Sequence, residues 1–73
     1  MTPPQHRVAR DFMARKGLTL EPFDVTQLDG QDCWYFYYRL PQGVLELEVS
    51  YDWATADWET TVTAFPVRRP HQA

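Results

Sequence analysis

Tyrosine, arginine and glutamate residues recur at every second position in the middle of the chain, a spacing that places them on one face of a β-sheet. Tyrosine and arginine are enriched at interface hot spots because each joins a large contact area to a polar tip. The carboxylates beside them favour a partner with a basic protein surface. The predicted partner-binding residues are Tyr35, Tyr37, Arg39, Glu46, Glu48 and Glu59, with Trp53 as an anchor from a neighbouring loop.

These residues also have a simpler interpretation. A tyrosine opposite a glutamate or a threonine stabilises a sheet without any partner. The sequence leaves both interpretations open, because the run Trp34–Tyr38 is aromatic on both of its faces.

A catalytic role is not expected for these carboxylates. Glu46 and Glu48 are two residues apart on one strand face, about 6.6 Å between Cα atoms, a spacing that suits acid–base work on a sugar. Such work needs a cleft that raises the pKa of one carboxyl, and an open sheet keeps both ionised. Cys33 has no neighbouring cation in the sequence to activate it as a nucleophile. We therefore predict that the protein is not an enzyme.

The sequence predicts no metal site and no cofactor. Asp52 and Asp57 flank a loop, but oxygen ligands at the regular intervals of a calcium loop are missing. His6 and His71 lie near opposite ends without companion ligands, and Cys33 is the sole cysteine. A single cysteine also allows no internal disulfide, which favours a reducing, cytoplasmic setting.

Charge is unevenly distributed, although the net charge is only −3. Residues 1–17 carry +3 and residues 67–73 carry +2, whereas residues 18–66 carry −8. The aromatic run Trp34–Arg39 is similar to the platforms on which single-stranded nucleic acids stack, but such sites need a positive field. We therefore expect no nucleic acid on the sheet face. A nucleic-acid binder that uses the basic helix and tail remains an alternative.

One amphipathic helix is predicted over residues 4–16. Val8, Ala9, Phe12 and Met13 fall within an arc of about 140° at 100° per residue, which gives the helix one apolar face. Proline is favourable at a first helical position and glycine just beyond a helix end, as Pro4 and Gly17 are placed here.

Four strands follow, predicted at 22–28, 31–40, 44–51 and 57–66. Asp29-Gly30 and Pro41-Gln42-Gly43 have the composition of tight turns. Short connections imply antiparallel neighbours, so the expected sheet is a β-meander. Residues 67–73 are expected to form a flexible tail.

Alternation assigns the faces of these strands. Burying the side of the third strand that carries Leu45, Leu47, Val49 and Tyr51 leaves Glu46 and Glu48 in water, whereas a slip of one residue would bury both charges. The corresponding inner set is Trp34, Phe36, Tyr38 and Leu40 in the second strand, with Phe23 and Val25 in the first. Val8, Phe12 and Met13 of the helix are expected to cover this face.

The sequence as a whole predicts one small α+β domain over residues 1–73, a helix packed on a four-stranded antiparallel meander. No apolar run approaches the roughly 20 residues of a membrane span, so we expect a soluble, cytoplasmic protein. The predicted function is a non-enzymatic protein-binding module, for example an inhibitor or a neutralising protein. Self-association into a homodimer through an exposed strand or the aromatic face is the other alternative.

Overall fold

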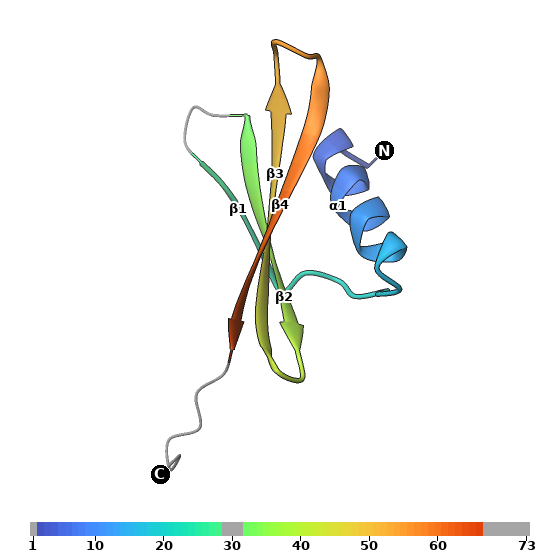
Figure 1. The fold of residues 1–73 in the computed structure, drawn as a ribbon, viewed down its shortest axis with the longest axis vertical. Coiled ribbons are helices and arrows are strands. Elements are labelled where there is room, and N and C mark those ends of the chain that lie inside the picture. Colours follow the sequence, from blue (N-terminus) through green and yellow to red (C-terminus); the bar gives the residue numbers. More distant parts are fainter. Residues whose placement is uncertain (1, 29–31, 67–73) are drawn as a thin grey trace.

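The fold combines one helix with one antiparallel sheet. A computed structural model describes residues 2–28 and 32–66. The elements are helix α1 (Pro4–Arg15) and strands β1 (Asp24–Gln27), β2 (Cys33–Leu40), β3 (Gly43–Asp52) and β4 (Asp57–Pro66). The strands lie in the order β1-β2-β3-β4, and all neighbours are antiparallel (Figure 1). The predicted α+β fold with a meander sheet is confirmed.

Helix α1 begins and ends where backbone chemistry requires. Pro4 occupies the first turn, where its missing N–H costs no hydrogen bond. At the other end Gly17 adopts a φ of 76°, and the Leu18 N–H donates to the Met13 carbonyl at 2.9 Å. This is a Schellman arrangement, which satisfies carbonyls that the last turn would leave without donors. The helix therefore ends at Arg15, one residue before the predicted end.

The turns fix the strand ends. The pair Leu40↔Gly43 leaves a two-residue turn, so β3 begins one residue earlier than predicted. The pair Asp52↔Asp57 encloses a four-residue loop that ends on Ala56, a non-glycine residue with a φ of 55°. Strand β1 is shorter than the predicted 22–28. The predicted Asp29-Gly30 turn and the predicted tail 67–73 lie outside the described residues.

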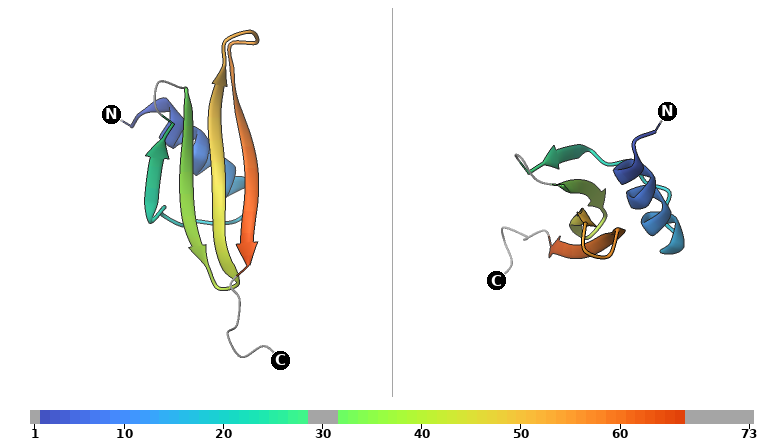
Figure 2. Two further views of the ribbon diagram at one scale, coloured as in Figure 1. Left: turned by 90° about the vertical axis from the view of Figure 1, so that its left-hand side faces the viewer. Right: turned by 90° about the horizontal axis from the view of Figure 1, so that it is seen from above.

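The core lies between α1 and one face of the sheet, which the helix covers (Figure 2). Its buried members are Ala9 and Met13 of α1, Phe36 and Tyr38 of β2, and Leu47 and Val49 of β3. Val8, Phe12, Leu45 and the aromatic rings of Trp34 and Trp58 pack against them. Phe36 lies opposite Leu47, which lies opposite Val62, so one row crosses three strands. The predicted inner faces of β2 and β3 and the predicted helix contacts are therefore confirmed.

The prediction for Phe23 is wrong. Strand β1 starts at Asp24, so the alternation of the strand does not reach Phe23. Its ring is 49% exposed and lies against Tyr37, whose side chain is on the face away from the helix, with ring centroids 6.4 Å apart. Val25 lies opposite the buried Phe36 but is 37% exposed itself, because it is on an edge strand.

Candidate binding face

The face of the sheet opposite α1 carries the polar residues that the alternation selects. We call it the outer face and define it by Tyr35, Tyr37, Arg39, Glu46, Glu48 and Glu59. Two rows cross it: Tyr37 lies opposite Glu46, which lies opposite Thr63, and Tyr35 lies opposite Glu48, which lies opposite Thr61. Glu59 lies opposite Ser50, and Arg39 lies opposite Val44. Ser50 and Val44 are on the same face of β3 as Glu46 and Glu48, so Glu59 and Arg39 also belong to the outer face.

In the first row, Tyr37 is tied to Glu46. The phenol O–H donates to the Glu46 carboxylate at 2.8 Å. This hydrogen bond is the main cause of the raised pKa of Tyr37, because loss of the phenolic proton would break the bond and place two negative charges side by side. Burial of the phenol raises the pKa further. Tyr37 is therefore held as a neutral, oriented ring over the strand pair.

In the second row, Cys33, Tyr35 and Glu48 form one cluster. The Cys33 thiol donates to the Glu48 carboxylate, with Sγ and Oε2 3.3 Å apart. Burial is the largest cause of a raised pKa of Cys33. The pKa of Tyr35 is raised to about 12, chiefly by its hydrogen bond to Cys33 and then by the negative charges of Cys33 and Glu48. A thiol that resists ionisation is a poor nucleophile, so these groups present hydrogen-bonding surface rather than reactive sulfur.

Arg39 follows the aromatic run of β2 and contacts Phe23, which the sequence interpretation had placed on the inner face. Its guanidinium lies 4.4 Å from the centroid of the Phe23 ring, within the range of a cation–π contact. Phe23 thus extends the outer face beyond Tyr37, toward the start of β1. No periodicity in the sequence marks this, because Phe23 precedes the strand and its direction depends on how the chain enters the sheet.

Trp53 lies in the β3–β4 loop, at the end of the sheet away from Arg39, and is 74% exposed. Its indole N–H donates to the Asp32 carboxylate, and its ring meets Tyr51 edge to face at 4.7 Å. These two contacts hold an exposed tryptophan in one position. A shallow hollow connects it to the outer face, lined by Leu28, Asp32, Cys33, Tyr35, Glu48, Ser50, Tyr51 and Trp53. Leu28 and Asp32 are members that the sequence interpretation missed.

The charged residues of the outer face are mainly acidic. In the part of the chain that the structure describes, Glu46 and Glu48 have hydrogen bonds to Tyr37 and Cys33, but no arginine or lysine forms an ion pair with them or with Glu59. Arg39, the one basic residue assigned to this face, is directed to the Phe23 ring. Carboxylates that form no ion pair with a described residue favour cationic groups near this face.

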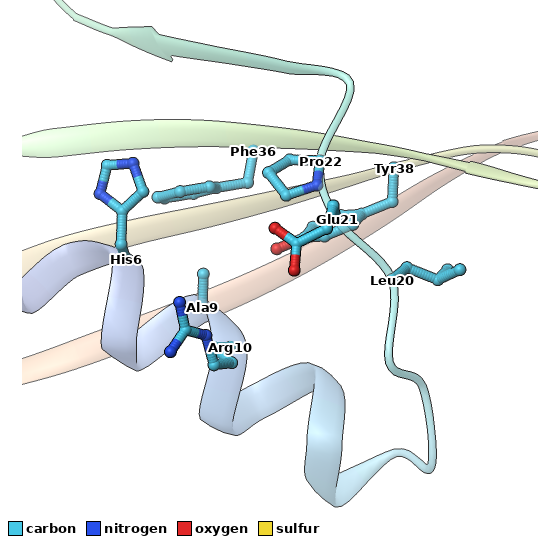
Figure 3. Close-up of a pocket in the computed structure, with 8 residues that line it drawn as sticks. All are labelled: His6, Ala9, Arg10, Leu20, Glu21, Pro22, Phe36 and Tyr38. Atoms are coloured by element: carbon cyan, nitrogen blue, oxygen red, sulfur yellow. The ribbon is translucent and has the colours of Figure 1, made fainter. Parts of the chain in front are cut away.

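A second, smaller pocket lies on the helix side, between α1, β2 and the segment that leads into β1 (Figure 3). Its volume is about 70 Å³, well below the roughly 300 Å³ at which small-molecule sites begin. The His6 ring meets Phe36 edge to face at 5.1 Å. Burial, followed by the charge of Glu21, raises the pKa of Tyr38. The pocket is a gap in the packing of the core rather than a ligand cleft.

Among residues 2–28 and 32–66, no three histidine, cysteine, aspartate or glutamate side chains gather as metal ligands. Helix α1, the helix within those residues, is too short and too polar to span a bilayer. The chain matches no protein-family model, no curated protein and no solved structure in the comparisons that we made.

Proposed function

We propose that the protein is a non-enzymatic binding module whose outer face occupies a basic surface on a partner protein. The observation that carries this proposal is that α1 covers one side of the sheet, while the other side presents Tyr37, hydrogen-bonded to Glu46, among carboxylates that form no ion pair with another described residue. A module of this kind acts by covering its partner, as an inhibitor or a neutralising protein does.

The hydrogen bonds of the outer face suit this role. The Tyr37 ring is held by its hydrogen bond to Glu46 before any partner arrives, so binding it costs less side-chain entropy. Aromatic residues held in this way are typical hot spots, and the surrounding carboxylates govern the rate of encounter and its dependence on salt. Trp53, held by Asp32 and Tyr51, supplies a further exposed aromatic ring at the end of the sheet.

The test is capture of a partner by the tagged full-length chain from a lysate of its source organism, at low and high salt, with nuclease present. We compare the wild type with Glu59→Lys, which reverses an exposed charge on the outer face, and with Tyr37→Ala. Glu21→Lys is the matched control, since it makes the same charge change on the segment before β1, beside the pocket of Figure 3.

We expect one stoichiometric protein that high salt weakens and that Glu21→Lys retains. Glu59→Lys should reduce its affinity about tenfold, and Tyr37→Ala about thirtyfold, the size expected of a hot spot. A partner that binds both outer-face variants as tightly as the wild type would show that this face is not the contact.

A further inference from the structure

The two edges of the sheet differ in length and in protection. Strand β1 has four residues, whereas β4 has ten and pairs with β3 without interruption from Asp57 to Pro66. No described element lies along the far side of β4 (Figure 2, left). An edge strand of this length, without a bulge, offers a row of backbone groups to any strand that approaches.

The register shows which backbone groups of β4 face outward. The Tyr51 N–H donates to the Asp32 carbonyl on the β2 side. The backbone N–H and C=O groups of odd-numbered residues in β3 therefore point toward β2. The backbone N–H and C=O groups of even-numbered residues in β3 point toward β4. Because Glu48 lies opposite Thr61, these groups bond to odd-numbered residues of β4. Odd-numbered residues of β4 thus complete the bonds to β3. The N–H and C=O groups of Thr60, Val62 and Ala64 are directed to the outer edge.

The side chains of residues 60–64 do not block this edge. Residues 60–64 read Thr-Thr-Val-Thr-Ala, a run without charge and rich in β-branched residues, and residues 61–64 are exposed. Edge strands are usually protected by lysine, by proline or by a bulge, and Pro66 places a proline at the last position of β4. Strand β4 has none of these between Thr60 and Ala64. Its two carboxylates, Asp57 and Glu59, are confined to its first third.

An apolar groove runs beside the same edge on the core side of the sheet. Phe12, Met13, Lys16 and Leu18 form one wall, and Leu45 and Val62 form the other. Val62 belongs to the row of the buried Leu47, yet it remains 42% exposed because no strand among the described residues lies beyond it. A strand added at this edge would cover Val62 and extend the core.

We propose that β4 pairs antiparallel with β4 of a second copy of this chain, which joins two four-stranded sheets into one of eight strands. Residues whose backbone groups point outward in one copy must pair with such residues in the other copy. Even-numbered positions of one β4 therefore lie opposite even-numbered positions of the other. In a pairing centred on Val62, Thr60 lies opposite Ala64 of the second copy. Each Glu59 then lies opposite the uncharged position 65 rather than opposite a carboxylate.

A second copy suits this edge because each β4 offers the other the same surface, and the pairing uses up the long edge of both sheets. Both copies contribute the same strand around a two-fold axis, and the remaining edge of each sheet is the short β1, which limits further addition. Opposed residues share a face of the sheet. Both helices therefore lie on one side, and the outer faces of the two copies remain open on the other.

The first measurement is sedimentation of the full-length chain between about 1 and 500 µM, a range that spans weak and moderate dissociation constants. We expect a concentration-dependent shift from the 8.6 kDa monomer to twice that mass. A chain that stays monomeric over the whole range overturns the proposal, and so does a species larger than a dimer.

The variant that tests the edge is Ala64→Pro. It removes an outward N–H without removing a bond to β3, and Ala64 lies on the core side, so the outer face is unchanged. Because the residue occurs twice in the dimer, we expect the dissociation constant to rise at least about tenfold. Ala64→Thr retains the N–H and should remain dimeric. A dimer unaffected by Ala64→Pro places the contact elsewhere and overturns the proposal.

A second variant covers the case in which Ala64→Pro does not fold. The double change Thr61→Lys and Thr63→Lys places lysines beside Glu48 and Glu46 in the monomer, where they are favourable. In the paired state lysines of the two copies face one another, so we expect dimerisation to be lost. Full dimerisation of this variant would contradict the proposal.

Amide hydrogen exchange supplies a readout specific to strand pairing. Thr61 and Thr63 should be protected at every concentration because they bond to β3. Thr60, Val62 and Ala64 should become protected only as the dimer forms. Dimerisation with no gain of protection at these three amides would show that the copies meet through another surface.

Discussion

On the core face of β3, Leu47 and Val49 lose all contact with solvent, whereas Glu46 and Glu48, each one residue away on the same strand, remain partly accessible. The first pair is held by packing against Phe36 and the helix. The second pair is held by single hydrogen bonds from Tyr37 and Cys33. The two faces of one strand thus use different forces, one to stabilise the fold and the other to fix the direction of surface groups.

The largest expected effect comes from the core face. Leu47→Ala removes buried methyl groups and leaves a cavity, so we expect the free energy of unfolding to fall by about 2–5 kcal/mol. Glu48→Ala, one residue away, should change it by no more than about 1 kcal/mol. Urea denaturation of both variants checks this contrast. Equal losses would mean that the outer face also carries the stability of the fold.

A smaller effect is expected from the Tyr37 hydrogen bond. Tyr37→Phe keeps the ring and removes the O–H that Glu46 accepts, so we expect a loss of about 0.5–1.5 kcal/mol. A double-mutant cycle with Glu46→Gln isolates the contribution of this pair. Strictly additive losses in the cycle would show that the two side chains are not coupled in solution.

The smallest effect on stability is a dependence on alkaline pH. The folded-state pKa of Tyr37 is raised, and that of Tyr35 is raised to about 12, above their ordinary value of 10.0. The folded state therefore holds its phenolic protons more tightly than the unfolded state. The stabilisation is complete below pH 10 and is lost as the pH rises through the folded-state values.

Tyrosinate absorbance against pH measures this directly. The wild type should show a step near pH 12 that Tyr35→Phe removes, and Tyr37→Phe should remove an earlier one. If the step near pH 12 persists in Tyr35→Phe, the cluster of Tyr35 with Cys33 and Glu48 does not form.

Several features were predictable from the residues because the signal is local. The glutamates of β3 alternate with leucine and valine, and only one register keeps both charges in water, so the faces of this strand follow from the sequence. Gly17 marks the end of the helix because few other residues adopt its φ. Alternation also placed Tyr35, Tyr37 and Arg39 on the outer face, but because both faces of this run are aromatic, the register with β3 was needed to decide it.

Other features depend on groups distant in the sequence. Trp53 is positioned by Asp32, which is 21 residues away, and the hollow beside it requires four segments to meet. Phe23 lies on the outer face because the chain enters β1 only at Asp24 and because Arg39 offers a cation to its ring. No local pattern encodes such contacts.

The sequence by itself determined the helix, the meander and the two-sided character of β3, because backbone propensity and the cost of burying charge act over a few neighbouring residues. The tertiary structure alone decided the place of Phe23 and Trp53, the cluster of Cys33 with Tyr35 and Glu48, and the exposure of the β4 edge. Each of these features depends on which strands are neighbours in the sheet and which strand forms its edge.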